Sequence, residues 1–200
     1  MYVGDTADGS GLHRTIGELV DNAINEALAG HCDRIDVTLN AGGSATVRDN
    51  GRGIPTDIHP SEGVSVTEVI MTRLHAFALF EASASSPTQL QGVGAAVVNA
   101  LSETLEARIF RDGKEHFIRF RLGHPEAPLA IVGNAETLDG HPRRGTEITF
   151  LPNPRFFANT AFDFDRIAHR VRGLASLNAG ATIVIADQRS AEKNETVLRI

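Results

Sequence analysis

Residues 11–30, "GLHRTIGELVDNAINEALAG", carry apolar side chains at the spacing of one face of an α-helix. The apolar positions are Leu12, Ile16, Leu19, Val20, Ala23, Ile24, Ala27 and Leu28. Apolar residues that recur every three or four positions indicate an amphipathic helix, and the glycine at position 30 marks its end. We therefore expect a helix over residues 11–29. An apolar stripe of this length must be buried, so the chain has to supply a second layer that covers it.

That second layer is predicted to be a β-sheet. "RIDVTLN" and "SATVRDN" alternate between apolar and polar residues and are joined by "AGG", a pattern typical of a hairpin. Four further strand-like runs lie between residues 105 and 152, and "ATIVIAD" and "ETVLRI" close the chain. Further helices are expected over residues 65–75, 93–102 and 163–178. Turns join most of the strands, so we predict an α+β fold in one domain spanning 1–200: a two-layer sandwich of helices on a mixed, mainly antiparallel sheet.

Composition excludes several classes of protein. Hydrophobic residues make up 42% of the 200 residues and charged residues 22%, as in ordinary soluble domains, and no apolar run reaches the length of a membrane span. The net charge of -6 argues against a surface coated by nucleic acid. The one cysteine, Cys32, excludes an internal disulfide framework and a cysteine-based zinc site. The N-terminal "MYVGDTADGSG" has no signal-peptide pattern, so we expect a cytoplasmic protein without a membrane partner.

The first predicted helix also carries polar residues beside its apolar stripe. Glu18 and Asn22 are four positions apart, which places them on the same helix face. A carboxylate in this setting can act as a general base toward water, and an amide oxygen is a ligand that suits Mg²⁺. The helix alone leaves a simpler alternative open, in which both residues belong to a solvated helix edge.

The segment "RDNGRGIP", residues 48–55, follows a predicted strand and interrupts it with two glycines and a proline. Glycine permits a positive φ and a close approach of the backbone to a ligand. Asp49, at the strand end, could accept a hydrogen bond from an adenine amino group. The alternative is a tight turn, because Asp-Asn-Gly is favourable turn chemistry.

Together these segments occur in the order of a known pattern. "GLHRTIGELVDNAINEALAG", "VRDNGRGIP", "QGVGAAVVNALS" and "RRGTEITFLP" resemble the ATP-binding domain of the GHKL ATPase superfamily, in the branch that contains the B subunit of DNA gyrase and the E subunit of topoisomerase IV. The resemblance covers nearly the whole chain. It implies ATP and Mg²⁺ as cofactors, a nucleotide held on the helical face of the sheet, and the ATP-hydrolysing part of a DNA topoisomerase, an antibiotic target.

The resemblance also implies roles for single residues. Glu18 matches the general base that activates the attacking water, and Asn22 matches the Mg²⁺ ligand. Asp49 matches the residue that binds the adenine amino group, with the help of Thr146. The wall of the adenine pocket would consist of three consecutive residues, Gly53, Ile54 and Pro55.

Two further sets of residues concern the phosphates and the inhibitors. Gly92, Val93 and Gly94 match the end of the phosphate loop, where backbone N–H groups at a helix start face an anion. Arg52 matches an arginine over which inhibitor rings stack, and Arg111 matches the rim arginine that aminocoumarin antibiotics contact.

The expected mobile lid, at about residues 76–91, departs from the family pattern. The sequence reads "HAFALF" where the family usually has His-Ala-Gly-Gly-Lys-Phe, so Leu79 replaces a cation. Three polar side chains also stand where the family has two glycines and a histidine: Thr88, Gln89 and Gln91. We therefore expect the adenine end to bind its ligand well and ATP hydrolysis to be weak.

The ends of the chain lead to expectations about partners. The 200 residues do not include the family's N-terminal arm, transducer or DNA-cleavage domain, and for these residues alone we expect a monomer that binds ATP or an adenine-site inhibitor. DNA and the A subunit of gyrase would be reached only through the missing domains of a full-length protein. The alternative is a stand-alone gyrase-like binding module, or a decoy that sequesters inhibitors, without significant ATPase activity. A protein histidine kinase is disfavoured, because no dimerising helical hairpin precedes the domain.

Overall fold

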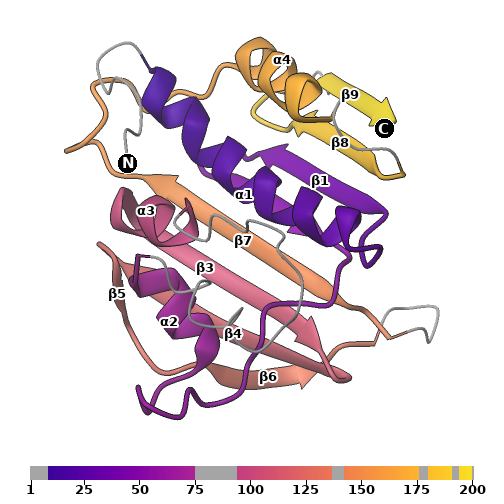
Figure 1. The fold of residues 1–200 in the computed structure, drawn as a ribbon. Coiled ribbons are helices and arrows are strands. Elements are labelled where there is room, and N and C mark those ends of the chain that lie inside the picture. Colours follow the sequence, from indigo (N-terminus) through magenta and orange to yellow (C-terminus); the bar gives the residue numbers. More distant parts are fainter. Residues whose placement is uncertain (1–8, 75–93, 137–141, 176–179, 191–193, 200) are drawn as a thin grey trace.

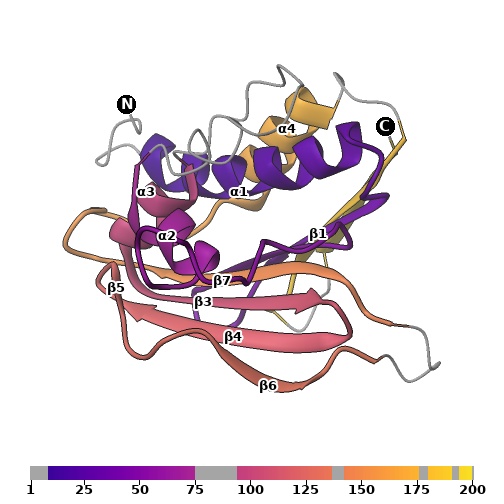
Figure 2. The ribbon, with the colours of Figure 1, turned by 60° about the horizontal axis from the view of Figure 1, so that its bottom comes forward.

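The computed structural model describes residues 9–74, 94–136, 142–175, 180–190 and 194–199. In this part of the chain, helices cover one face of a single twisted β-sheet (Figure 1 and Figure 2). This is the two-layer α+β sandwich predicted from the sequence. The expected lid at 76–91 lies outside the described residues, as do Gly92 and Val93.

The sheet has nine strands in the described residues. They are β1 (Arg34–Leu39), β2 (Ala45–Asp49), β3 (Ser102–Arg111), β4 (Lys114–Arg121), β5 (His124–Pro125), β6 (Ala130–Asn134), β7 (Gly145–Pro152), β8 (Thr182–Asp187) and β9 (Asn194–Arg199). Their order is β5-β4-β3-β7-β2-β1-β8-β9, and β6 pairs with β4. The β1–β8 pair is parallel and the others are antiparallel, which confirms a mixed, mainly antiparallel sheet.

Four helices form the second layer of the described structure: α1 (Ser10–Leu28), α2 (Val66–Thr72), α3 (Gly94–Ala100) and α4 (Phe164–Ala175). The predicted ends agree within one residue for α1 and within three for α2. Ser65 explains where α2 begins, because its side-chain oxygen accepts a hydrogen bond from the backbone N–H of Glu68 at 3.1 Å and so caps the helix. Within the described residues, no helix has both the length and the apolar character needed to cross a membrane.

The core lies between α1 and the inward face of the sheet. Leu12, Ile16 and Val20 of α1 are at most 1% exposed, and so are the inward residues of β1, Ile35, Val37 and Leu39. The outward face of the sheet carries charged pairs such as Arg108–Glu115, so the sheet is buried on one side only. Burial of its apolar stripe fixes the rotation of α1 about its axis and leaves Glu18 half-buried at the margin of the core.

Candidate functional site

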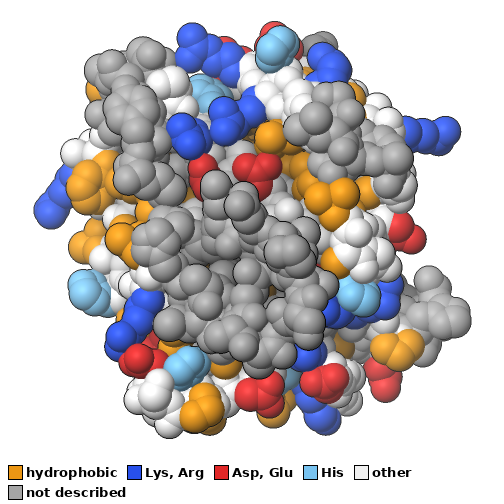
Figure 3. Space-filling view, viewed as in Figure 1, with side chains coloured by type: hydrophobic (Ala, Val, Ile, Leu, Met, Phe, Trp, Pro, Cys, Tyr) orange, Lys and Arg blue, Asp and Glu red, His pale blue; other side chains and the backbone are white. Residues whose placement is uncertain are grey.

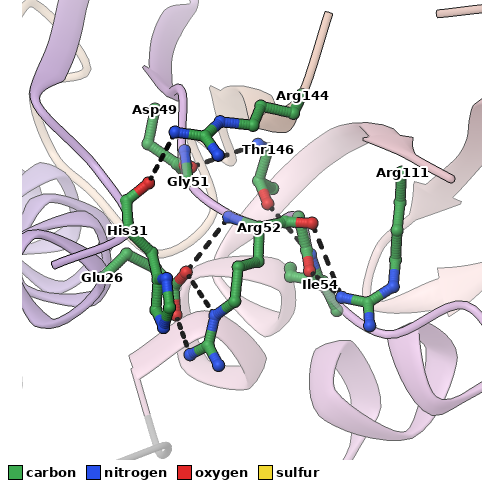
Figure 4. Close-up of polar contacts among 10 residues, drawn as sticks. Glu26, His31, Asp49, Gly51, Arg52, Ile54, Arg111, Arg144 and Thr146 are labelled. Atoms are coloured by element: carbon green, nitrogen blue, oxygen red, sulfur yellow. Dashed lines mark hydrogen bonds and ion pairs between the residues drawn. The ribbon is translucent and has the colours of Figure 1, made fainter. Parts of the chain in front are cut away.

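Asp49 is the last residue of β2, and only one oxygen of its carboxylate accepts hydrogen bonds from the described residues. Its Oδ1 atom accepts hydrogen bonds from the backbone N–H groups of Gly51 at 2.8 Å and Thr146 at 3.3 Å (Figure 4). Its Oδ2 atom makes no hydrogen bond to any described residue. Burial raises the pKa of Asp49 to about 6, although the two backbone bonds oppose this shift. The site therefore holds a carboxylate with one oxygen available to a donor on a ligand.

Two glycines allow the backbone to pack closely around Asp49. Gly145 has a φ of +115°, and a Cβ atom on it would overlap the carbonyl oxygen of Asp49. Gly53 has a φ of +77°, and its Cβ would lie 3.1 Å from the carbonyl oxygen of Phe110. Residues other than glycine are strained at such φ values. The turn after β2 therefore reaches the ends of β3 and β7 only because both positions are glycine.

Thr146 and Thr67 hold the strap formed by residues 53–55. The backbone N–H of Ile54 donates to Oγ1 of Thr146 at 3.2 Å, and Oγ1 of Thr67 donates to the carbonyl oxygen of Pro55 at 2.8 Å. The strap is thus fixed from β7 on one side and from α2 on the other. Because the Thr146 hydroxyl acts as an acceptor in this bond, its own proton stays available to a ligand or a water.

Arg52 and Arg111 lie beside the same strap (Figure 4). The guanidinium of Arg52 forms a two-point contact with Glu26, Nε to Oε2 at 3.1 Å and Nη2 to Oε1 at 2.8 Å. Burial disfavours the ionised form of Glu26, but the hydrogen bonds from Arg52 prevail and lower the pKa of this carboxyl. Nη1 of Arg111 donates to the carbonyl oxygen of Gly53 at 2.8 Å. Both arginines are therefore held at defined positions on the rim.

Glu18 lies at the other end of the site, between α1 and the start of α3. Its Oε1 atom lies 3.2 Å from Nε of Arg14, and the Glu18 side chain is 18% exposed. A Cβ atom on Gly94, the first residue of α3, would lie 2.7 Å from Oε2 of Glu18, so glycine is required there. Burial and the nearby charge of Glu18 raise the pKa of Asp21, and Arg170 and Arg14 partly offset this. Acidic and basic side chains gather over α1 on this face (Figure 3).

Three polar residues of α1 connect the two ends. Glu18, Asn22 and Glu26 follow one another at intervals of four residues, so they form one row along the helix of about 12 Å. The row ends at the Asp49 turn, because a Cβ atom on Gly51 would lie 3.0 Å from Oε2 of Glu26 and 2.9 Å from Oδ1 of Asp49. The predicted residues that the structure describes thus lie along or next to this row, whereas Gly92 and Val93 lie outside the described residues.

Two residues that contribute to the site were not predicted as site residues. Glu26 anchors Arg52, and its position eight residues after Glu18 was the signal that could have identified it. Arg144 donates from Nε to the carbonyl oxygen of Asn50 at 3.1 Å and from Nη2 to that of His31 at 3.4 Å, which ties the Asp49 turn to the end of α1 (Figure 4). No local pattern in "HPRRG" indicates this contact.

The donor set near Asn22 restricts how a metal could bind. Among the described residues, no group of three or more His, Cys, Asp or Glu side chains could hold a metal ion. The amide of Asn22 makes no hydrogen bond within the same residues. A cation that keeps most of its water and takes one protein oxygen plus ligand phosphates, as Mg²⁺ does, fits this arrangement better than a metal that needs a full protein cage.

Comparison with known proteins gives the family. The family described as "Histidine kinase-, DNA gyrase B-, and HSP90-like ATPase" matches residues 7–155. The chain belongs to this ATPase family. The match includes Glu18, Asn22, Asp49 and Thr146, so the whole described site lies in the part that defines the family.

Curated members of this ATPase family can be aligned with almost the whole chain. The B subunit of DNA gyrase from Rickettsia conorii is 55% identical over 196 residues, which cover 98% of this chain and 24% of the relative. The Caulobacter vibrioides protein of the same name is 49% identical over 204 residues, covering 99% of this chain and 25% of the relative. The chain therefore spans about a quarter of the length of these curated relatives.

A solved structure shows the same fold. The crystal structure of the 43K ATPase domain of Thermus thermophilus gyrase B in complex with an aminocoumarin matches with a TM-score of 0.82 and 42% sequence identity. The match covers 98% of this chain and 48% of that chain. The chain is thus a gyrase B-like ATPase domain by both sequence and fold, as the motifs predicted.

Proposed function

We propose that the chain binds Mg-ATP along the row from Asp49 to Glu18, as the ATPase domain of a DNA gyrase B-like type II topoisomerase. The observation that carries the proposal is the half-engaged carboxylate of Asp49, whose Oδ2 atom has no partner within the described residues while Oδ1 is held by Gly51 and Thr146. An acceptor fixed in this way suits the exocyclic amino group of adenine. Ile54 and Pro55, on the strap beside it, would cover the ring.

The other end of the row supports hydrolysis of the terminal phosphate. The Glu18 carboxylate would accept a proton from the attacking water. Asn22, four residues along the same face, would hold Mg²⁺ by its amide oxygen, and the ion would offset the phosphate charge. Gly94, together with Gly92 and Val93, would present backbone N–H groups to the phosphates.

Two finer features of the proposal concern activity and inhibitors. The sequence of the lid at residues 76–91 lacks the cation and the glycines usual in the family, which favours weak hydrolysis by this domain. Arg111, fixed on the Gly53 carbonyl, and Arg52, held by Glu26, would border an aminocoumarin-type inhibitor on the rim. The Thermus thermophilus relative was solved with such a compound.

The activity of a larger protein is also part of the proposal. As one domain of a gyrase B-like protein in the cytoplasm, the chain would supply ATP-driven motion, and other domains would contact DNA and the A subunit of gyrase. The lid departures favour a second candidate function, a stand-alone module that binds adenine-site inhibitors without significant turnover. The full reading frame of the gene distinguishes these two candidate functions, because a continuation into transducer and DNA-cleavage domains would support only the first.

Calorimetric titration and an ATPase assay test the proposed site. We expect Mg-ATP and an aminocoumarin to compete for the unaltered chain, and Glu18→Gln to abolish residual hydrolysis without weakening the aminocoumarin. Placing glycine at 77, 78, 88 and 89, lysine at 79 and histidine at 91 is expected to strengthen ATP binding while aminocoumarin affinity stays constant. A chain that binds neither ligand would contradict the proposal.

A further inference from the structure

Arg14 on α1 places its guanidinium next to Glu18, and most of its N–H donors have no acceptor among the described residues. Its Nε atom contacts Oε1 of Glu18 at 3.2 Å, and its side chain is 38% exposed. A guanidinium has five N–H donors, and within the described residues only the one on Nε has a hydrogen-bond acceptor. With respect to the described residues, four donors are thus available to an anion beside the Glu18 carboxylate.

The position of Glu18 determines where that anion would lie. A general base must be within hydrogen-bond reach of the water that it activates, and the water must be about 3–3.5 Å from the atom that it attacks. If Glu18 is the base, the terminal phosphorus of ATP lies roughly 6 Å from its carboxylate. A guanidinium bonded to the same carboxylate would be within range of the terminal phosphate if the attacked phosphorus lies on its side of Glu18.

The packing of Glu18 restricts it to the side where Arg14 lies. A Cβ atom on Gly94 would lie 2.8 Å from Cβ of Glu18 and 2.7 Å from its Oε2 atom, so α3 closes one side of the carboxylate. Arg14 is one helical turn earlier on α1 and contacts the other carboxylate oxygen, Oε1. Because an ionised Glu18 would repel a polyphosphate, a cation bonded to Glu18 also reduces the electrostatic cost of bringing the two together.

We propose that Arg14 binds the terminal phosphate of the nucleotide and thereby distinguishes a nucleoside triphosphate from a diphosphate. The inference rests on the proposed function, since it takes Glu18 as the general base. Planar guanidinium groups bind phosphate oxygens with two parallel hydrogen bonds, which lysine cannot reproduce. Arg14 would therefore hold the phosphate through its Nη atoms while Nε stays on Glu18.

Arg170 of α4 offers a matched control. It also adds a positive charge near α1, and its Nε atom is buried without a hydrogen-bond partner among the described residues. It lies over Gly17, where a Cβ atom would be 3.2 Å from its Cζ atom, and within the same part of the chain it forms no ion pair with Glu18. Neutralising Arg170 removes the same charge from the region without removing the donors beside Glu18.

The test is displacement of a fluorescent adenine-site inhibitor by Mg-ATP and by Mg-ADP, for the unaltered chain and for Arg14→Gln, Arg14→Lys and Arg170→Gln. We expect Arg14→Gln to weaken ATP by about ten- to a hundredfold and ADP by less than about threefold. Arg14→Lys should recover part of the loss, and Arg170→Gln should leave the ratio of the two affinities unchanged. Thermal unfolding of each variant checks that the fold is intact.

Two results overturn the proposal in different ways. Equal weakening of ATP and ADP by Arg14→Gln, or no weakening, would show that Arg14 does not bind the terminal phosphate, and the proposed function would stand. Displacement by neither nucleotide from the unaltered chain, with the inhibitor still bound, would remove the ATP site itself and Arg14's role with it.

Discussion

Asp49 and Gly145 are packed so closely that no side chain fits on Gly145. A Cβ atom there would overlap the carbonyl oxygen of Asp49 and would lie 2.9 Å from Cα of Asn50. Both obstructing atoms belong to the backbone, so no side-chain rotation can relieve the overlap. The position of the Asp49 carboxylate therefore depends on a glycine almost a hundred residues further along the chain.

Gly145→Ala is expected to lower the free energy of unfolding by roughly 2–4 kcal/mol, because it combines an unfavourable φ with overpacking. Urea-induced unfolding measures the change. Gly42→Ala is the matched control, since a Cβ atom at that position meets nothing within 4 Å, and it should change stability by less than about 0.5 kcal/mol. Equal effects of the two substitutions would contradict the close packing.

Asp49→Asn is expected to weaken an adenine-site inhibitor at least tenfold while the fold persists. Asparagine keeps an acceptor oxygen for the N–H groups of Gly51 and Thr146 but loses a charged acceptor, and charged hydrogen bonds contribute roughly 1.5–3 kcal/mol. Isothermal titration calorimetry compares both proteins. Asp36→Asn, which affects a carboxylate on β1 paired with Arg34, should leave the affinity unchanged. Full affinity in the Asp49 variant would exclude this carboxylate from ligand contact.

Inhibitor affinity should also depend on pH in a way that Asp49 alone explains. The pKa of this carboxyl is raised to about 6, and only the ionised form is the strong acceptor. Below pH 6 the affinity should fall by up to about tenfold per pH unit, as expected for one proton. Titrations between pH 5 and 7 measure the slope. Asp49→Asn should show a flat profile, and a slope that persists in this variant would assign the dependence to another group.

The same shift predicts how stability changes with pH. The folded-state pKa of Asp49 lies above the value of 3.8 for an unperturbed carboxyl, so protonation favours the folded state. The contribution is fully present below about pH 4 and is lost as the pH rises through 6, a change of roughly 3 kcal/mol for about two pKa units. The stability of the unaltered chain relative to Asp49→Asn should therefore decrease between pH 4 and 7. A constant difference in urea unfolding would mean that the carboxyl is solvated.

Gly17→Ala tests the packing of Arg170 on α1. Alanine in a helix interior is normally more stable than glycine by roughly 0.5–1 kcal/mol, but a Cβ atom on Gly17 would displace the Arg170 guanidinium. The gain should appear in full only when Arg170→Ala is also present. A double-mutant cycle by thermal unfolding measures this coupling, and additive effects would show that Arg170 moves aside at no cost.

The layers of the fold could be predicted because they follow from local periodicity. Strands β1 and β2 alternate between buried and partly exposed positions, and the buried residues of α1 recur with helical spacing, so the predictions for these elements agree with the structure. The helix predicted to 75 ends at Thr72 because Arg73 is extended, with φ -118° and ψ 133°, which no pattern in "MTRL" indicates. Strand β5 has only two residues, too few to show any period.

The pattern of residues alone could not show how the site is assembled. Asp49 meets Thr146 because β2 pairs with β7, and strand order is a property of the whole chain. The resemblance to a known family supplied that pairing in advance. The Arg52–Glu26 contact and the Arg144 contacts depend on how three side chains cross between elements, so only the structure reveals them.

In the parallel pair of β1 and β8, two strands that are far apart in the sequence become neighbours in the sheet. Ile35 is the register partner of Ile183, so the ribosome makes one edge of β1 long before its neighbour exists. At roughly 5–20 residues per second, that strand waits on the order of ten seconds with its N–H and C=O groups open to other chains. A nascent chain stopped at residue 155, where the family match ends, would retain that open edge permanently. Protection of β1 from aggregation thus depends on the last fifth of the chain.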